Sequence, residues 1–221
     1  MHRWELEAQL LNGCHRLADK GFLNSSSDSL SVRIPGTAEM IFAAAAENCR
    51  DRGIATIATK PFISEEVVAA VHGMIYRERP DVGAVAISSP RGVRLLAKSG
   101  EILPPLFDEQ IRHIGLSSRT RLDENRLSKE HIHKAFKRGA NAALLGQRLL
   151  CLGMTCERVV FNTELFEKCA QAYVIAKASG ARPAEIPAWV RLIAIHRLSQ
   201  EELKAAASYR QGRLPEGTSA Y

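Results

Sequence analysis

Glu65 and His72 have the spacing of an acid–base pair. They lie seven residues apart, so a helix from Ser64 to residue 79 would bring both side chains onto one face. A carboxylate and an imidazole placed in this way can move a proton during catalysis. The alternative interpretation is an exposed acid at the start of the helix and a histidine that packs in the core.

Residues 107–114 contain a second pair of this kind. Glu109 and His113 lie four residues apart on a predicted helix, and Asp108 adds a carboxylate, which is a spacing that can hold a metal ion. Ordinary solvated side chains are the alternative. His131 and His133 lie two apart on another predicted helix, where they point about 200° apart, so we do not expect them to chelate one ion.

The five cysteines are odd in number and scattered, and no C-x-x-C pair occurs. This pattern predicts free thiols in a reducing compartment. Cys151 and Cys156 flank Gly153, and Arg148 would lower the pKa of a nearby thiol, but no residue is identified as the base that a nucleophilic cysteine needs. The cysteines are Cys14, Cys49, Cys151, Cys156 and Cys169.

Local patterns predict the elements that must position these residues. Apolar spacing indicates a first helix over residues 3–20 that Gly21 ends, and Thr155 is placed to cap a helix over 156–179. Further helices are predicted over 64–79, 90–99, 107–114, 128–138, 184–197 and 199–210, and strands over 29–34, 40–46, 54–59, 82–88, 140–145 and 149–152. This order predicts one α/β domain over residues 1–210 with a mixed, mostly antiparallel central sheet, followed by a flexible tail over 211–221.

The composition excludes several classes of function. With 46% hydrophobic and 24% charged residues, the chain of 221 residues is typical of a globular protein in solution. Its net charge of +6 is spread along the chain and aromatic residues are only 6%, which disfavours nucleic-acid binding. No apolar run approaches the ~20 residues of a membrane span, and the N-terminus lacks an apolar signal core, so we expect a cytoplasmic protein.

Four stretches, in order along the chain, resemble the class II aldolase/adducin family. They are residues 17–36, 69–90, 103–115 and 143–173. The resemblance implies a three-layer α/β/α fold and a homotetramer with sites between neighbouring subunits. It also implies a divalent metal, mostly zinc, that three histidines hold and that stabilises an enolate-like intermediate in aldol cleavage, epimerisation or decarboxylation.

The positions that match the metal ligands lack histidine. The family's H-x-H falls on Ala86 and Ser88, and its third histidine falls on Gln147, which Arg148 follows in place of a glycine. Alanine has no donor atom, a serine hydroxyl is a poor zinc ligand, and an amide oxygen binds only hard cations weakly. The resemblance therefore predicts that this chain has no metal site.

Two further functional positions also differ from the family. The proton-handling glutamate, four residues before His72, is Val68. The Gly-Asn pair that helps to hold a substrate phosphate or carboxylate reads Asp28-Ser29, and a carboxylate there would repel an anion. Because the packing positions between them keep the resemblance, the loss is confined to the chemistry.

We therefore predict a pseudoenzyme without a cofactor that acts as a binding or scaffolding subunit. The resemblance implies a homo-oligomer, a tetramer, or assembly with an active relative or another protein. The alternative is a lyase of the aldolase or decarboxylase type acting on a small hydroxy or oxo acid. It would act through a non-standard or relocated site in the same cleft, with Glu65 and His72, or Asp108, Glu109 and His113, as the candidate residues. Tyr209 would reach a neighbour's cleft, as C-terminal tyrosines do in some family aldolases. Its substrate-binding residues would be Ser29, Ser88, Gln147 and Arg148.

Overall fold

A single antiparallel sheet forms the centre of the molecule. The computed structural model describes residues 3–45, 54–116, 120–136 and 139–215, so Cys49 and the end of the predicted tail lie outside the described residues. The six strands follow the order β3-β2-β1-β4-β6-β5, and each neighbouring pair is antiparallel. The strands are β1 (Ser29–Arg33), β2 (Glu39–Ala45), β3 (Ile54–Pro61), β4 (Ala84–Ser88), β5 (Ala142–Leu145) and β6 (Arg148–Gly153). A parallel contact is made by the isolated bridge between Leu122 and Leu145.

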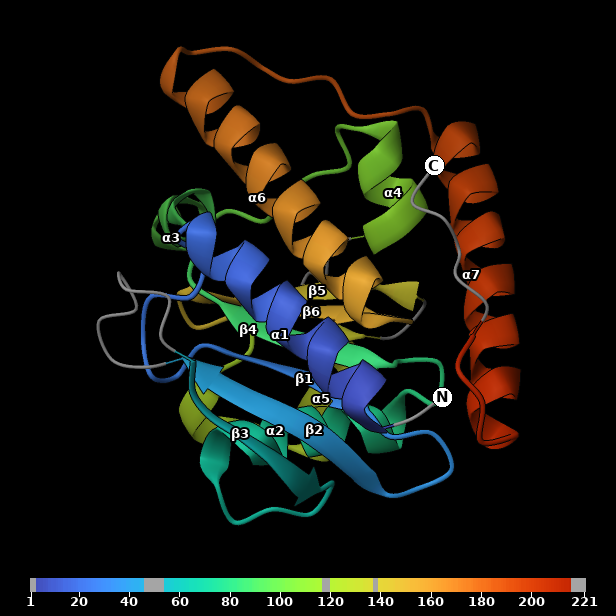
Figure 1. Ribbon diagram of the computed structural model, residues 1–221. Coiled ribbons are helices and arrows are strands. Elements are labelled where there is room, and N and C mark those ends of the chain that lie inside the picture. The colour runs from blue at the N-terminus through green and yellow to red at the C-terminus, as the bar shows by residue number, and fades with distance from the viewer. Residues whose placement is uncertain (1–2, 46–53, 117–119, 137–138, 216–221) are drawn as a thin grey trace.

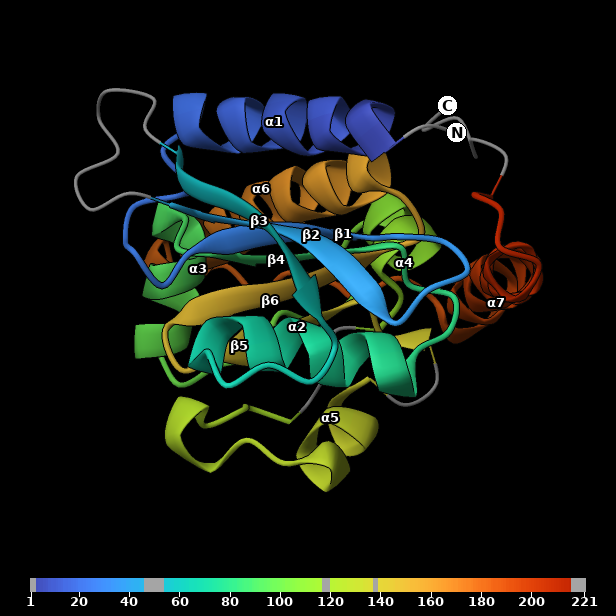
Figure 2. The same cartoon turned by 60° about the horizontal axis from the view of Figure 1, so that its bottom comes forward.

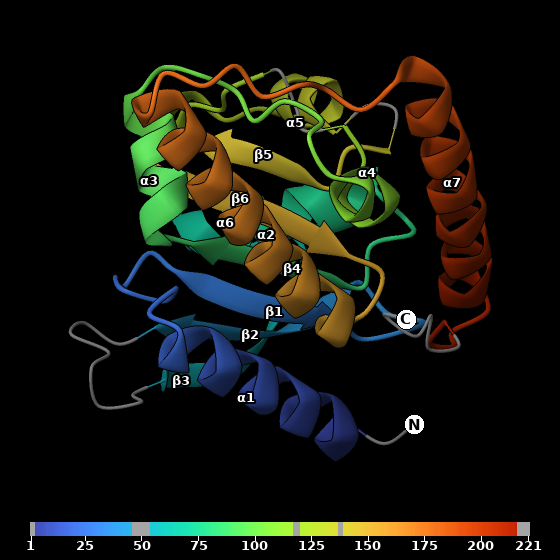
Figure 3. The same cartoon turned by 90° about the horizontal axis from the view of Figure 1, so that it is seen from above.

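Helices cover both faces of this sheet (Figures 1 and 2). One face carries α1 (Arg3–Asp19), α3 (Arg91–Lys98) and α6 (Cys156–Ala178), and the other carries α2 (Val67–Glu78) and α5 (Lys129–Ala135). Beside α6 lies α4 (Asp108–Ile114), and α7 (Ala188–Arg210) packs against α4; Figure 3 shows α7 along one side of the layers. The predicted three-layer α/β/α fold is confirmed. In the described residues no helix is both long and apolar enough to cross a membrane.

Strand alternation divides the interior into two cores. Leu30, Ala86 and Cys151 are neighbours across β1, β4 and β6, and their side chains lie in the core beneath α1, α3 and α6. Ile87 and Leu150 point the other way and pack beneath α2 and α5. Successive residues of a strand therefore belong to different cores, so a shift of one position moves a side chain to the opposite face.

Several element boundaries differ from those that local patterns predict, and two of the differences change the arrangement of the helices. The helix expected to start at Ser64 begins at Val67, because residues 62–66 form bends and Glu66 occupies the N-cap position. The predicted pair of C-terminal helices is one continuous helix, α7, since Ser199 is not accompanied by a proline or glycine that would break it. Thr155 does cap α6 by accepting a hydrogen bond from the amide of Arg158.

Candidate functional site

Polar residues gather at one end of the central strands. Because β1, β4 and β6 are successive antiparallel neighbours, the start of β1, the end of β4 and the start of β6 lie side by side. The chain enters β1 through Asp28, leaves β4 through Ser89 and enters β6 through Arg148. We call these three residues and the loop 24–28 the strand-end cluster.

The carboxylate of Asp28 is the centre of the strand-end cluster. Its Oδ2 accepts hydrogen bonds from the amides of Asn24 at 2.7 Å and Ser25 at 3.0 Å, and its Oδ1 accepts one from Ser89 Oγ at 2.7 Å. Burial raises the pKa of Asp28, and these hydrogen bonds together with the charge of Arg148 oppose that rise. The Asp28 carboxylate therefore accepts the hydrogen bonds of the loop amides and of Ser89, which would otherwise be free to bind the anionic group of a ligand.

Arg148 closes the cluster from the β5–β6 turn. Its guanidinium donates to the carbonyl oxygen of Ser27 and forms a two-point ion pair with Glu124, at 3.0 Å from Nε and 2.8 Å from Nη2. The positive charge is thus matched within the chain. Gln147, its neighbour in the turn, is exposed.

His72 belongs to a buried hydrogen-bond network. Its Nε2 lies 2.9 Å from Ser29 Oγ and its Nδ1 lies 2.7 Å from Ser31 Oγ, which in turn lies 2.7 Å from the hydroxyl of Tyr76. The residue is fully buried, and burial with the nearby charge of Arg148 lowers the pKa of His72 to about 3. His72 is therefore neutral at physiological pH and ties α2 to β1.

Glu65 does not pair with this histidine. It is exposed and lies in the bend before α2, so the predicted common helical face of Glu65 and His72 does not exist. Val68, at the position of the family's glutamate, is the second residue of α2 and is half-buried. The acid–base geometry expected from the sequence is wrong because the helix starts later than Ser64.

Ala86 and Ser88 face away from His72. By strand alternation their side chains point into the core beneath α1, α3 and α6, where Ala86 packs and Ser88 pairs with Leu149. The hydroxyl of Ser88 is buried and has no hydrogen-bond partner among the described residues. Ser88 therefore makes no hydrogen bond to the strand-end cluster among the described residues, and its expected role in substrate binding stays a prediction.

Ser89 is the cluster residue that sequence reasoning missed. It follows the last residue of β4 and precedes Pro90, the N-cap of α3, so it leaves the sheet and is released from strand alternation. Its amide donates to the carbonyl oxygen of Phe22 at 2.8 Å, which fixes the direction of its side chain. The proline directly after Ser89 was the available signal for this position.

The other predicted metal and acid–base candidates are dispersed. Glu109 is exposed, whereas the His113 ring packs at 5.0 Å against Phe161 and contacts Arg158. Burial and the charges of Arg158 and Arg112 lower the pKa of His113 to about 4. In the described part of the chain, no three His, Cys, Asp or Glu side chains are grouped closely enough to hold a metal ion; His131 and His133 are exposed.

The cysteine and tyrosine candidates are buried inside their own chain. Burial raises the pKa of Cys151 and of Cys156 to about 12, so both remain protonated thiols. The Tyr209 hydroxyl, which was expected to reach the cleft of a neighbouring subunit, instead donates a hydrogen bond to the carbonyl oxygen of Met154 at 2.8 Å in its own chain.

The residues at the family's ligand positions do not fit zinc. Ala86 has no donor atom, the Ser88 hydroxyl is buried in the core beneath α1, α3 and α6, and Gln147 is an exposed amide. Zinc in proteins takes imidazole, thiolate or carboxylate ligands, and none of the three positions supplies one.

Comparisons with known proteins agree with the fold. Solved structures superpose well at low identity: an L-fuculose 1-phosphate aldolase has a TM-score of 0.74 at 20% identity, with 90% of this chain and 98% of that chain covered. An L-fuculose 1-phosphate aldolase from Glaciozyma antarctica has a TM-score of 0.72 at 18% identity, with 95% of this chain and 88% of that chain covered. An aldolase II superfamily protein from Pseudomonas syringae has a TM-score of 0.70 at 15% identity, with 96% of this chain and 94% of that chain covered. No curated protein matches the sequence.

The family assignment comes from the sequence match. Residues 8–174 match the family model described as the class II aldolase and adducin N-terminal domain; this range covers the sheet, α2 to α5 and most of α1 and α6. The four stretches that carry the resemblance lie within this range. The chain therefore belongs to the class II aldolase and adducin N-terminal domain family.

Proposed function

We propose that this protein is a non-catalytic binding or scaffolding member of its family. The observation that carries the proposal is the internal pairing of the strand-end cluster. Asp28 binds the donors of its own loop and of Ser89, and Arg148 binds Glu124 and Ser27. A catalytic site needs charged groups and donors that are directed at the reacting atoms, and these are directed at one another.

The residues at the three ligand positions support the same proposal. Aldol chemistry in this family uses a bound metal as a Lewis acid, and the side chains of Ala86, Ser88 and Gln147 offer no ligand set for zinc. His72 is held neutral between Ser29 and Ser31, which supports a structural role for the histidine.

Elemental analysis tests the proposal directly. We expect far less than one zinc, manganese or iron per chain in protein purified without a histidine tag or added metal. The His131→Gln/His133→Gln double variant is the matched control, because it removes the exposed histidines that would adsorb metal at the surface. A stoichiometric metal that survives dialysis against a chelator and persists in the double variant would contradict the loss of the site.

A lyase with a non-standard site is the second candidate function. Burial raises the pKa of Asp28, and a carboxyl group with a raised pKa beside Ser89 and Arg148 is a group suited to proton transfer. Its substrate would be a small hydroxy or oxo acid. If the protein turns over such acids, and Asp28→Asn abolishes the turnover while Glu65→Gln leaves it intact, the lyase is favoured. If the unmodified protein shows no turnover, the scaffold is favoured.

We also infer a reducing compartment, such as the cytoplasm, and assembly as a homo-oligomer. Four cysteines are free and buried: Cys14, Cys151, Cys156 and Cys169. Buried free thiols are ordinary in a reducing environment. An active relative or another protein as the partner remains the alternative to self-assembly, and sedimentation of the purified protein alone distinguishes the two.

A further inference from the structure

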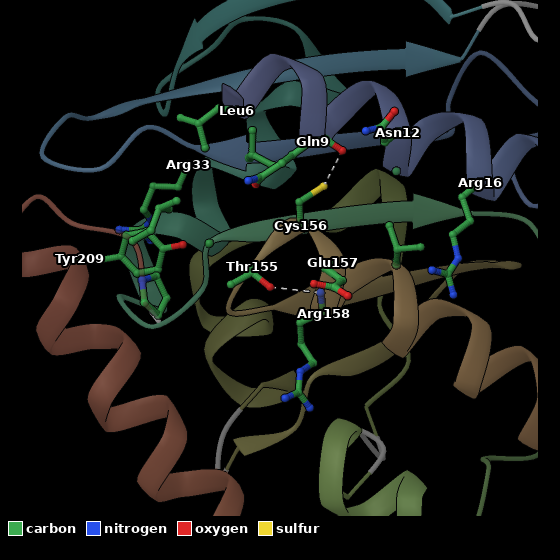
Figure 4. Close-up of a pocket in the computed structure, with 16 residues that line it drawn as sticks. Leu6, Gln9, Asn12, Arg16, Arg33, Thr155, Cys156, Glu157, Arg158 and Tyr209 are labelled. Atoms are coloured by element: carbon green, nitrogen blue, oxygen red, sulfur yellow. Dashed lines mark hydrogen bonds between the residues drawn. The ribbon is translucent and has the colours of Figure 1, made fainter. Parts of the chain in front are cut away.

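A hollow of about 380 Å³ lies at the opposite end of the strands from the strand-end cluster. It is formed where β1 ends at Arg33, where Gly83 leads into β4, and where α6 begins after Thr155. The volume is within the range of pockets that hold small molecules. We call it the α1–α6 hollow, and Figure 4 shows its lining.

The walls of the α1–α6 hollow are mainly apolar. One side of α1 forms a wall that faces the first turns of α6, and Cys156 Sγ donates to the carbonyl oxygen of Gln9 where the two helices meet. Tyr209 from α7 and the segment after it complete the enclosure. The apolar part of the lining consists of Leu6, Val32, Val160, Tyr209, Leu214 and Pro215.

Arg33 brings a positive charge to one end of this hollow, where its guanidinium lies over the rings of Tyr76, Tyr209 and Phe62 at 5.0, 5.3 and 5.4 Å and has no hydrogen-bonded carboxylate among the described residues. Its Nη2 donates to the carbonyl oxygens of Tyr76 at 2.6 Å and Arg79 at 3.0 Å, and its Nε is buried without a partner among the described residues. The carboxylate that acts on Arg33 is that of Asp81, and both of its oxygens bind Arg79. Aromatic rings stabilise a guanidinium without neutralising its charge, so Arg33 still attracts an anion to this end of the hollow.

Two further arginines line the hollow, and each also contacts a carboxylate outside the lining: Arg16 pairs with Glu164, and Arg158 lies 3.9 Å from Glu201. Figure 4 places Arg33 and Tyr209 at one end and Arg16 at the other, with the first turn of α6 between them. The amino end of this helix of 23 residues carries a partial positive charge. Arg158 also lines the hollow while its guanidinium contacts His113, and Glu157 is the acid in the lining.

We propose that the α1–α6 hollow binds a small organic anion, a carboxylate or phosphate monoester with a short apolar or aromatic body. The anionic group balances Arg33 near the start of α6, and the body packs against Leu6, Val32 and Val160. The proposal does not depend on the proposed function, because the hollow and the strand-end cluster lie at opposite ends of the sheet.

Titration with simple probes tests the chemistry of the ligand. Benzoate and phenyl phosphate represent the two anion classes, and benzamide is the uncharged match for benzoate. We expect an anion to raise the melting temperature and to bind in calorimetry at least about tenfold more tightly than benzamide. The tighter of the two anions identifies the head group. Equal binding of benzamide, or no binding of either anion, would overturn the proposal.

Two pairs of variants test the location. Asn12→Trp fills the hollow, whereas His15→Trp places the same ring on an exposed part of α1 outside the lining. Arg16→Gln and Lys20→Gln each remove a cation that pairs with Glu164, but only Arg16 lines the hollow.

We expect Asn12→Trp to weaken binding about tenfold and Arg16→Gln to weaken it severalfold, with both controls unchanged. All four side chains are exposed, three on α1 and Lys20 in the turn directly after it, so melting temperatures without ligand verify that the variants fold. Equal effects within each pair would contradict the location. Loss of binding in Ser89→Ala, at the opposite end of the sheet, would do so as well.

Discussion

At the scale of single residues, two buried serines differ in their surroundings. Ser88 Oγ has no partner among the described residues, whereas Ser31 Oγ contacts both His72 and Tyr76 at 2.7 Å. We expect Ser88→Ala to leave the free energy of unfolding unchanged or raise it by about 1 kcal/mol, and Ser31→Ala to lower it by about 2 kcal/mol. Urea denaturation measures both variants, and similar losses would show that Ser88 has a partner.

His72 makes stability depend on pH. Its pKa in the folded protein is about 3 because the ring is buried, whereas a histidine in the unfolded chain titrates near 6.5. The unfolded chain therefore binds a proton that the folded chain excludes. The free energy of unfolding should fall from about pH 6.5 towards pH 3, by up to about 1.4 kcal/mol per pH unit for this group.

The His72→Gln variant isolates that contribution. Other groups that titrate in this range, such as His113, remain in both proteins and cancel in the comparison. We expect the variant to be less stable at pH 7 but to lose less of its stability on acidification. Urea unfolding at several pH values between 4 and 7 gives the two slopes, and identical slopes would mean that His72 is protonated in the folded state.

At the scale of elements, Arg79 attaches α7 to the rest of the molecule. Its guanidinium pairs with Asp81 at 2.7 and 2.8 Å, with Glu202 of α7 at 3.1 Å, and with the side chain of Asn141 at 2.9 Å. The contact joins the end of α2, the turn before β4 and the middle of α7. Removing the arginine would leave two largely buried carboxylates without their cation.

We expect Arg79→Met to lower the free energy of unfolding by about 3–5 kcal/mol and to speed amide exchange in α7. Arg191→Met is the control on the same helix, because its pair with Glu185 is more exposed and its loss should cost at most about 1 kcal/mol. Equal costs for the two variants would refute the anchoring role of Arg79.

At the scale of the whole molecule, the outer side of α7 carries exposed apolar side chains that a second copy of the chain could cover. Trp189, Leu192 and Ile193 are 67%, 70% and 48% exposed and lie one helical turn apart, while the opposite side of the helix packs against α4. Contiguous exposed apolar side chains are typical of an interaction surface. A second copy of the chain is the partner that the family resemblance favours.

We therefore expect the purified protein to sediment as an oligomer and Leu192→Glu to shift it towards the monomer. Ile175→Glu, on the exposed side of α6, is the control for adding a charge at an equally exposed apolar position. A monomer at all concentrations, or the same mass for both variants, would count against a second copy on α7.

The sequence alone determined most of the elements, the fold class and the family. Apolar periodicity placed α1 and β1, and Thr155 marked the start of α6, because these signals depend on residues close together in the chain. The absence of histidine at Ala86, Ser88 and Gln147 was also readable from the chain, since residue identity needs no structure.

Only the tertiary structure decided how the side chains are used. Ser89 rather than Ser88 joins Asp28, because the end of β4 fixes which residue leaves the sheet. His72 is neutral and Arg33 lacks a carboxylate of its own, because burial and partners that are distant along the chain set the energy of a charge. The α1–α6 hollow likewise exists only after α1, α6 and α7 meet, and no local pattern encodes that meeting.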